Sequence, residues 1–121
     1  MKKNVRLPLI LALAAGAVPV ASALASQPTA YAAATHIVKL QNIMINPMTL
    51  KIHKGDRVTW EFLDGPSTEH TVTSEAHKGG LRFKGTGPKF SGSYTVKFSK
   101  AGTYYYECTI HPNMMGKIVV H

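Results

Sequence analysis

The chain has 121 residues and a formal net charge of +8, with one cysteine and a hydrophobic fraction of 45%. This length suits a single domain with one modest core and leaves little room for a second. Three of the 14 basic residues lie in the first six positions, so 11 basic and 6 acidic side chains remain beyond them, a balance of +5. The lysines are spread along the chain, which disfavours a nucleic-acid site and is compatible with an acidic protein partner or an anionic membrane surface.

The N-terminus has the pattern of a secretory signal. Basic residues precede an uncharged apolar run at residues 7–24, and small residues follow at the A-x-A spacing of a cleavage site. We expect residues 1–25 to be the signal, residues 26–35 a flexible lead-in and residues 36–121 the folded domain. Residues 32–34 offer a second cleavage site, and an uncleaved membrane anchor is the alternative, since about 20 apolar residues can span a bilayer. The expected location is the periplasm or the outer face of the cell envelope.

From residue 36 onward, apolar and polar residues alternate with the period of two that indicates β-strands. Strands are expected in chain order at residues 38–41, 49–53, 57–62, 70–73, 94–98, 104–108 and 117–120. Glycine- and proline-containing turns separate most of them. Short strands with such turns predict an all-β fold, a two-sheet antiparallel β-sandwich of about seven to eight strands.

The stretch at residues 75–92 is the least regular part of this pattern. It holds five glycines and Pro88. We expect a loop that crosses between the sheets, with one short strand at residues 81–83.

Strand alternation also predicts which side chains point inward. Tyr104, Tyr106 and Cys108 share one face of their strand, and His70 shares a face with Val72. Burying a neutral imidazole and a thiol costs free energy unless something pairs them. A lone cysteine in an exported protein cannot form an internal disulfide, so it also needs a reason. A bound metal would pair the two buried groups and would also explain the lone cysteine.

The spacing after the strand at residues 104–108 identifies the metal. Cys108, His111 and Met114 lie within seven residues, so a tight loop can fold them onto one point. With the distant His70, the set comprises two imidazoles, a thiolate and a thioether. Soft sulfur with imidazole favours copper. Zinc is the main competitor, but structural zinc sites use four Cys and His ligands, and a thioether suits zinc poorly.

These features resemble the cupredoxins of the plastocyanin and amicyanin kind. The matching segments, in the family's order, are Gly55-Asp56-Arg57-Val58-Thr59-Trp60, His70-Thr71-Val72-Thr73, Ala101-Gly102-Thr103-Tyr104-Tyr105-Tyr106-Glu107-Cys108, and the loop that continues into Gly116-Lys117-Ile118-Val119-Val120. The resemblance covers nearly everything from residue 36 to residue 121. It implies a Greek-key sandwich and one type 1 copper ion.

The resemblance assigns the copper ligands one residue at a time. His70 corresponds to the upstream imidazole, Cys108 to the thiolate and His111 to the second imidazole. The short amicyanin-like loop places the axial thioether at Met114, whereas the longer plastocyanin-like loop would place it at Gly116. Many relatives carry Asn directly after the upstream histidine. This chain has Thr71, whose backbone N–H is expected to donate to the Cys108 sulfur.

The function that the resemblance implies is a single-electron carrier that cycles between Cu(II) and Cu(I). Redox proteins would be its partners, and the chain itself would be a monomer. A copper chaperone or storage protein outside the cytoplasm is the alternative. An enzyme is disfavoured, because copper oxidases and reductases need further copper sites, usually with His-x-His pairs, and the sequence has no such pair. The other histidines have no partner at ligand spacing and are expected at the surface; they are His36, His53, His77 and His121.

Overall fold

The computed structural model describes residues 30–76 and 79–121. The predicted signal at residues 1–25 and the first four residues of the predicted lead-in lie outside the described residues. Residues Ala32–His121 form one compact unit. In the described part of the chain, none of the helical structure has the length and hydropathy of a membrane span.

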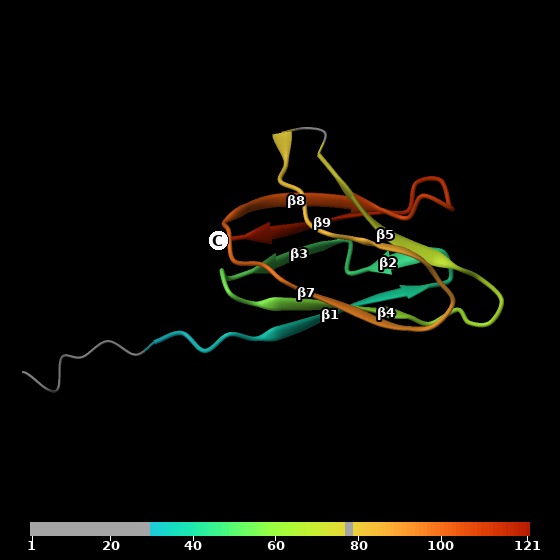
Figure 1. Ribbon diagram of the computed structural model, residues 1–121, viewed down its shortest axis with the longest axis horizontal. Coiled ribbons are helices and arrows are strands. Elements are labelled where there is room, and N and C mark those ends of the chain that lie inside the picture. The colour runs from blue at the N-terminus through green and yellow to red at the C-terminus, as the bar shows by residue number, and fades with distance from the viewer. Residues whose placement is uncertain (1–29, 77–78) are drawn as a thin grey trace, which may run out of the picture. The chain divides into compact units, whose positions relative to one another are not determined.

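The described residues form nine strands in two sheets. In chain order these are β1 (Thr35–Gln41), β2 (Met44–Asn46), β3 (Thr49–Ile52), β4 (Arg57–Phe62), β5 (His70–Glu75), β6 (Thr86–Lys89), β7 (Gly92–Lys97), β8 (Gly102–Glu107) and β9 (Met115–Val120). One sheet has the order β2-β1-β4-β7 and the other β3-β9-β8-β5-β6. They face each other as two layers (Figure 1). The predicted all-β, two-sheet sandwich is therefore confirmed, with the short strands β2 and β6 added.

Most neighbouring strands are antiparallel, and two pairs are parallel. β1 runs parallel to β4, and β3 runs parallel to β9. The strands of each parallel pair are joined by long connections that leave the sheet, as parallel pairing requires. As a result β9 lies between β3 and β8, inside the five-stranded sheet and not at its edge.

The short strand expected at residues 81–83 is absent, and the strand of this region is β6. The backbone at these residues makes its hydrogen bonds outside any ladder. The Leu81 N–H donates to the Thr103 carbonyl at 2.8 Å, and the Phe83 N–H donates to the Ser74 hydroxyl at 3.0 Å. The Phe83 ring stacks on Trp60 with centroids 5.5 Å apart. This segment closes the core as an irregular loop.

The core is built around Trp60, which is fully buried. Tyr106 meets it edge-on with ring centroids 5.4 Å apart, and Phe98 packs beside it. Within the described residues, the Trp60 Nε1 and the Tyr106 hydroxyl are buried without a hydrogen-bond partner of ordinary geometry. Burial raises the pKa of Tyr106 to about 12, and the neighbouring Trp60 indole opposes that rise. The expectation that Tyr104 and Tyr106 belong to the core is confirmed.

Candidate metal centre

His70 is the first residue of β5, and its side chain is fully buried. Its ring has two different neighbours. Nε2 lies 2.7 Å from Oδ2 of Asp64, and Nδ1 lies 4.0 Å from Sγ of Cys108. A carboxylate accepts a hydrogen bond and cannot donate one when ionised, so Nε2 carries the proton and Nδ1 presents its lone pair towards the sulfur.

Asp64 lies in the turn between β4 and β5, six residues before His70. The hydrogen bond with His70 lowers the pKa of Asp64, and the Asn42 N–H lowers it further, while burial acts in the opposite direction. The Asn42 N–H donates to Oδ2 at 2.8 Å. The carboxylate is therefore held ionised behind the His70 ring. Sequence reasoning missed this residue, because a turn aspartate gives no sign of the ring that it will contact.

Cys108 follows β8 directly and is buried, with 2% of its surface exposed. Its backbone N–H donates to the Met114 carbonyl at 2.9 Å, which closes the loop at residues 108–114. Asn113 has a φ of 66°, in the left-handed region where Asn is among the best tolerated residues. The loop can therefore turn tightly enough to return His111 and Met114 to the cysteine.

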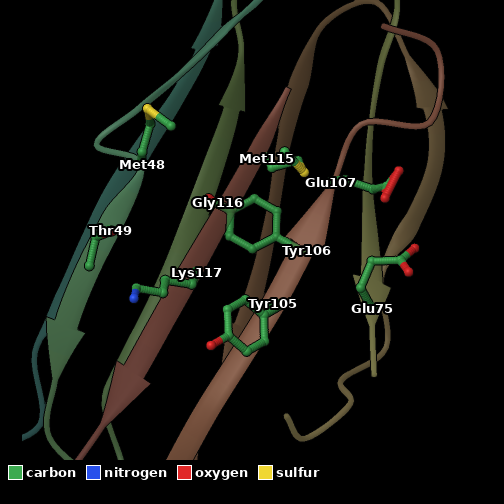
Figure 2. Close-up of a pocket in the computed structure, with 9 residues that line it drawn as sticks. All are labelled: Met48, Thr49, Glu75, Tyr105, Tyr106, Glu107, Met115, Gly116 and Lys117. Carbon is green, nitrogen blue, oxygen red and sulfur yellow. The ribbon is translucent and has the colours of Figure 1, made fainter. Parts of the chain in front are cut away.

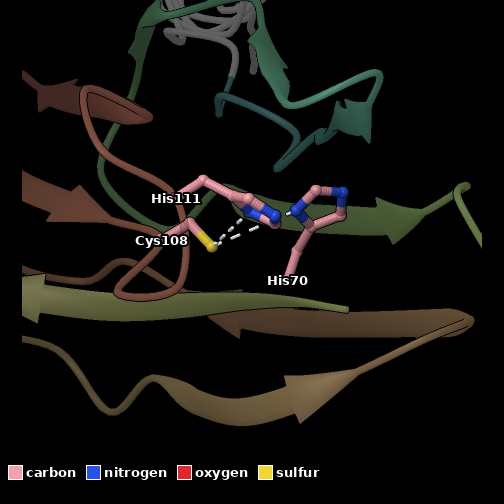
Figure 3. A group of neighbouring side chains, drawn as sticks. All are labelled: His70, Cys108 and His111. Carbon is pink, nitrogen blue, oxygen red and sulfur yellow. Dashed lines mark hydrogen bonds between the residues drawn. The ribbon is translucent and has the colours of Figure 1, made fainter. Parts of the chain in front are cut away.

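Figure 3 shows the three side chains that this arrangement brings together, His70, Cys108 and His111. The Cys108 Sγ lies 4.0 Å from Nδ1 of His70 and 3.6 Å from Nδ1 of His111. All three donor atoms lie within 4.8 Å of one another. Bond lengths typical of a tetrahedral metal, about 2.0 Å to nitrogen and about 2.3 Å to sulfur, separate such donors by about 3.3 to 3.5 Å, so small side-chain rotations would bring these three onto one ion. The residues present therefore fit one metal ion at this point.

The two methionines at the end of the loop differ in exposure. Both line the cavity of the loop with Cys108 and His111, but Met114 is 3% exposed whereas Met115 is 48% exposed. With Met114, the cluster offers two imidazoles, a thiolate and a thioether. This donor set fits a type 1 copper site.

Comparison with known proteins agrees with this geometry. A family profile described as "Cupredoxin-like domain" matches residues 11–120. The chain belongs to the cupredoxin family. It is 35% identical to amicyanin of Paracoccus denitrificans over 85 residues, which cover 69% of this chain and 63% of the relative. It is 32% identical to amicyanin-alpha of Methylorubrum extorquens over 121 residues, with 92% of each chain covered. The chain thus spans less than two thirds of the first of these relatives and nearly all of the second.

Solved structures of cupredoxin domains give the same result. A variant of amicyanin in its reduced Cu(I) form at pH 4 superposes with a TM-score of 0.59 and 32% identity, over 77% of this chain and 86% of that one. A copper-containing nitrite reductase from Thermus scotoductus gives a TM-score of 0.60 and 30% identity, but only 26% of its chain is covered. This chain is an amicyanin-like type 1 copper protein.

Thr71 links the two segments that carry the cupredoxin site. Its backbone N–H donates to the Cys108 sulfur at 3.4 Å, as predicted. Its hydroxyl accepts the Thr109 N–H at 3.0 Å and lies 2.9 Å from the Thr73 hydroxyl. The Thr71 hydroxyl therefore makes the side-chain connection between the two segments that carry His70 and Cys108.

A larger cavity, of about 240 Å³, lies apart from the three donor atoms. It is on the outer face of the five-stranded sheet (Figure 2), and its lining includes Met48, Tyr105, Glu107, Met115 and Lys117. Met115 and Glu107 are partners in the β8–β9 register. Met115 therefore lines this outer cavity as well as the cavity of the loop.

Proposed function

We propose that this cupredoxin is a single-electron carrier that holds one copper ion through His70, Cys108, His111 and Met114. The observation that carries the proposal is the convergence of the two Nδ1 atoms on the Cys108 sulfur. Bound copper would supply the one-electron change between Cu(II) and Cu(I). The names of the relatives support the same assignment, since they are amicyanins and one solved variant is in a Cu(I) form.

The chain's own residues keep such a site rigid. His70 is fixed by its strand and by Asp64, and Cys108 is fixed by the Thr71 and Met114 backbones. Burial of these side chains excludes water from the donor atoms. A site whose ligands cannot move far changes little when the oxidation state changes, which suits rapid electron exchange.

His111 is the donor that reaches the surface. It is half-buried, whereas His70 and Cys108 are buried. Ile110 on the same loop is 43% exposed, and Met115 at the start of β9 is 48% exposed; both line the loop cavity with His111. A small apolar rim around a half-exposed imidazole suits brief docking, because transient redox complexes bury little area.

The finer parts of the proposal concern location and partners. The sequence pattern supports an exported protein of the periplasm, with residues 1–25 removed, residues 26–35 as lead-in and residues 36–121 as the working domain. The basic balance supports an acidic redox protein as partner and transient contact with an anionic membrane surface, and we take the domain to act as a monomer. We do not infer catalysis from the nitrite reductase, because only 26% of that chain is covered.

Absorption and EPR spectra of the purified protein with Cu(II) test the proposal. A thiolate–Cu(II) site should be intensely blue, ascorbate should bleach it, and an oxidant should restore it. Cys108→Ser should abolish the colour, because a hydroxyl cannot replace the thiolate. A colourless protein that releases copper readily to a weak chelator would point instead to copper storage or delivery. An equally blue Cys108→Ser protein would falsify the ligand assignment.

A further inference from the structure

Two histidines that the sequence placed at the surface without partners lie side by side. His53 follows β3 and His121 follows β9, and both are exposed. Because β3 and β9 are parallel with Ile52 opposite Val120, the next residue of each strand falls opposite the other. The ring centroids of His53 and His121 are 4.6 Å apart and the rings are inclined by 65°.

This arrangement closely matches the imidazole pair of the copper site. The His70 and His111 rings have centroids 5.0 Å apart and are inclined by 55°. The distance and the angle therefore differ by 0.4 Å and 10° between the two pairs. Two imidazoles at this spacing can turn their nitrogens towards a single ion by rotation about their side-chain bonds.

The backbone holds the His53–His121 pair in register. The His121 N–H donates to the Ile52 carbonyl at 2.9 Å, and the Lys54 N–H donates to the His121 carbonyl at 3.0 Å. The His53 N–H donates to Oδ2 of the buried Asp56 at 3.1 Å. Binding an ion would therefore order only the two side chains, which lowers the entropic cost of forming the site.

The charges around the pair select the kind of ion. Lys51 precedes His53 on the same face of β3, Lys54 follows it, and Lys117 lies on the corresponding face of β9. Beneath the pair, Asp56 accepts hydrogen bonds from the His53 backbone and from Nε2 of His36. The positive charge of the neighbouring lysines, with no exposed carboxylate offered in exchange among these residues, disfavours the binding of hard cations such as Ca²⁺ and Mg²⁺, which take oxygen ligands. Neutral imidazoles still bind Cu(II), Ni(II) and Zn(II), of which Cu(II) has the highest affinity.

We propose that His53 and His121 form a second metal site, which binds a divalent transition-metal ion such as Cu(II). The site lies at the end of the sandwich opposite the loop at residues 108–114, where Figure 1 marks the C-terminal end of β9. The β8–β9 register runs from Glu107 opposite Met115 to Gly102 opposite Val120, so the two sites are roughly 20 Å apart. Two imidazoles with water would complete the coordination. Without a thiolate, this ion would be exchangeable and would give no blue colour.

The test begins with the full chain loaded with one equivalent of copper. Further Cu(II) is titrated in a weakly chelating buffer while EPR and the blue absorbance are followed. We expect one additional equivalent with its own EPR signal, whose hyperfine pattern indicates nitrogen ligands, at constant blue absorbance. His53→Ala and His121→Ala should each weaken this second binding by about tenfold or more. Retained blue absorbance shows that both variants are folded.

His36→Ala is the matched control, since His36 lies at the same end but its Nε2 contacts Asp56. It should leave the second binding unchanged. The proposal fails if neither His53→Ala nor His121→Ala weakens the second binding, if His36→Ala weakens it equally, or if the extra Cu(II) signal is absent. The proposed electron-carrier role is tested separately, because a Cys108→Ser protein that has lost the blue colour should still bind Cu(II) at His53 and His121.

Discussion

Asp64 and His70 are joined through Oδ2 and Nε2 at 2.7 Å, on the side of the imidazole away from Cys108. The carboxylate both orients the ring and places a negative charge behind it. Asp64→Asn keeps an acceptor but removes the charge, so Cu(II) should lose more stabilisation than Cu(I) and the reduction potential should rise. Asp64→Ala also frees the ring and should weaken Cu(II) binding by about 10- to 100-fold. Voltammetry and chelator competition measure these effects, and native values in both variants would contradict them.

Met114 and Met115 should respond differently to the same substitution. Met114 is buried, whereas Met115 is 48% exposed and lines both the loop cavity and the outer cavity. Met114→Leu removes a thioether donor, which favours Cu(I), so we expect the potential to rise. Met115→Leu changes only an exposed side chain and should leave the potential nearly unchanged. The reverse behaviour of the two variants would show that the thioether is assigned to the wrong residue.

Tyr106→Phe tests the buried polar atoms at the centre of the core. The Tyr106 hydroxyl has no hydrogen-bond partner of ordinary geometry within the described residues. An unsatisfied buried group of this kind costs about 1–3 kcal/mol, so its removal should leave the free energy of unfolding unchanged or raise it by about 1 kcal/mol. Denaturant unfolding of the copper-free protein measures this difference. A clear loss of stability in Tyr106→Phe would indicate that the hydroxyl makes a bond with a buried water.

The rate of association with an acidic redox partner should fall as salt is added. The chain beyond its first six residues carries a balance of +5, and its lysines are dispersed. Exposed charges are screened over about 10 Å at 0.1 M ionic strength, so steering should weaken steeply between low and physiological salt. Stopped-flow mixing at several salt concentrations measures the rate. If the association rate with the physiological partner does not depend on salt, the partner does not bind through an acidic surface.

Much of the site could be predicted because it depends on local patterns. Alternation placed His70 and Cys108 on buried faces, and the spacing from Cys108 to Met114 indicated one short loop. Contacts between distant segments leave no such pattern. The alternation of apolar and polar residues does not show that β3 pairs with β9, so the sequence did not predict the His53–His121 pair. The contacts of Asp64 with His70 and of Phe83 with Trp60 were not predicted for the same reason, because Asp64 and Phe83 lie in irregular segments and contact residues on other elements.

The position of β9 between β3 and β8 has a consequence for how the protein matures. β3 and β8 each pair with β9 and not with each other, so they join one sheet only when β9 has docked between them. The loop at residues 108–114 is fixed only when β9 docks, because β9 is one of its two anchors. Such non-local pairing is slow compared with local hairpin formation. Metal binding at this loop should therefore follow the docking of β9 between β3 and β8.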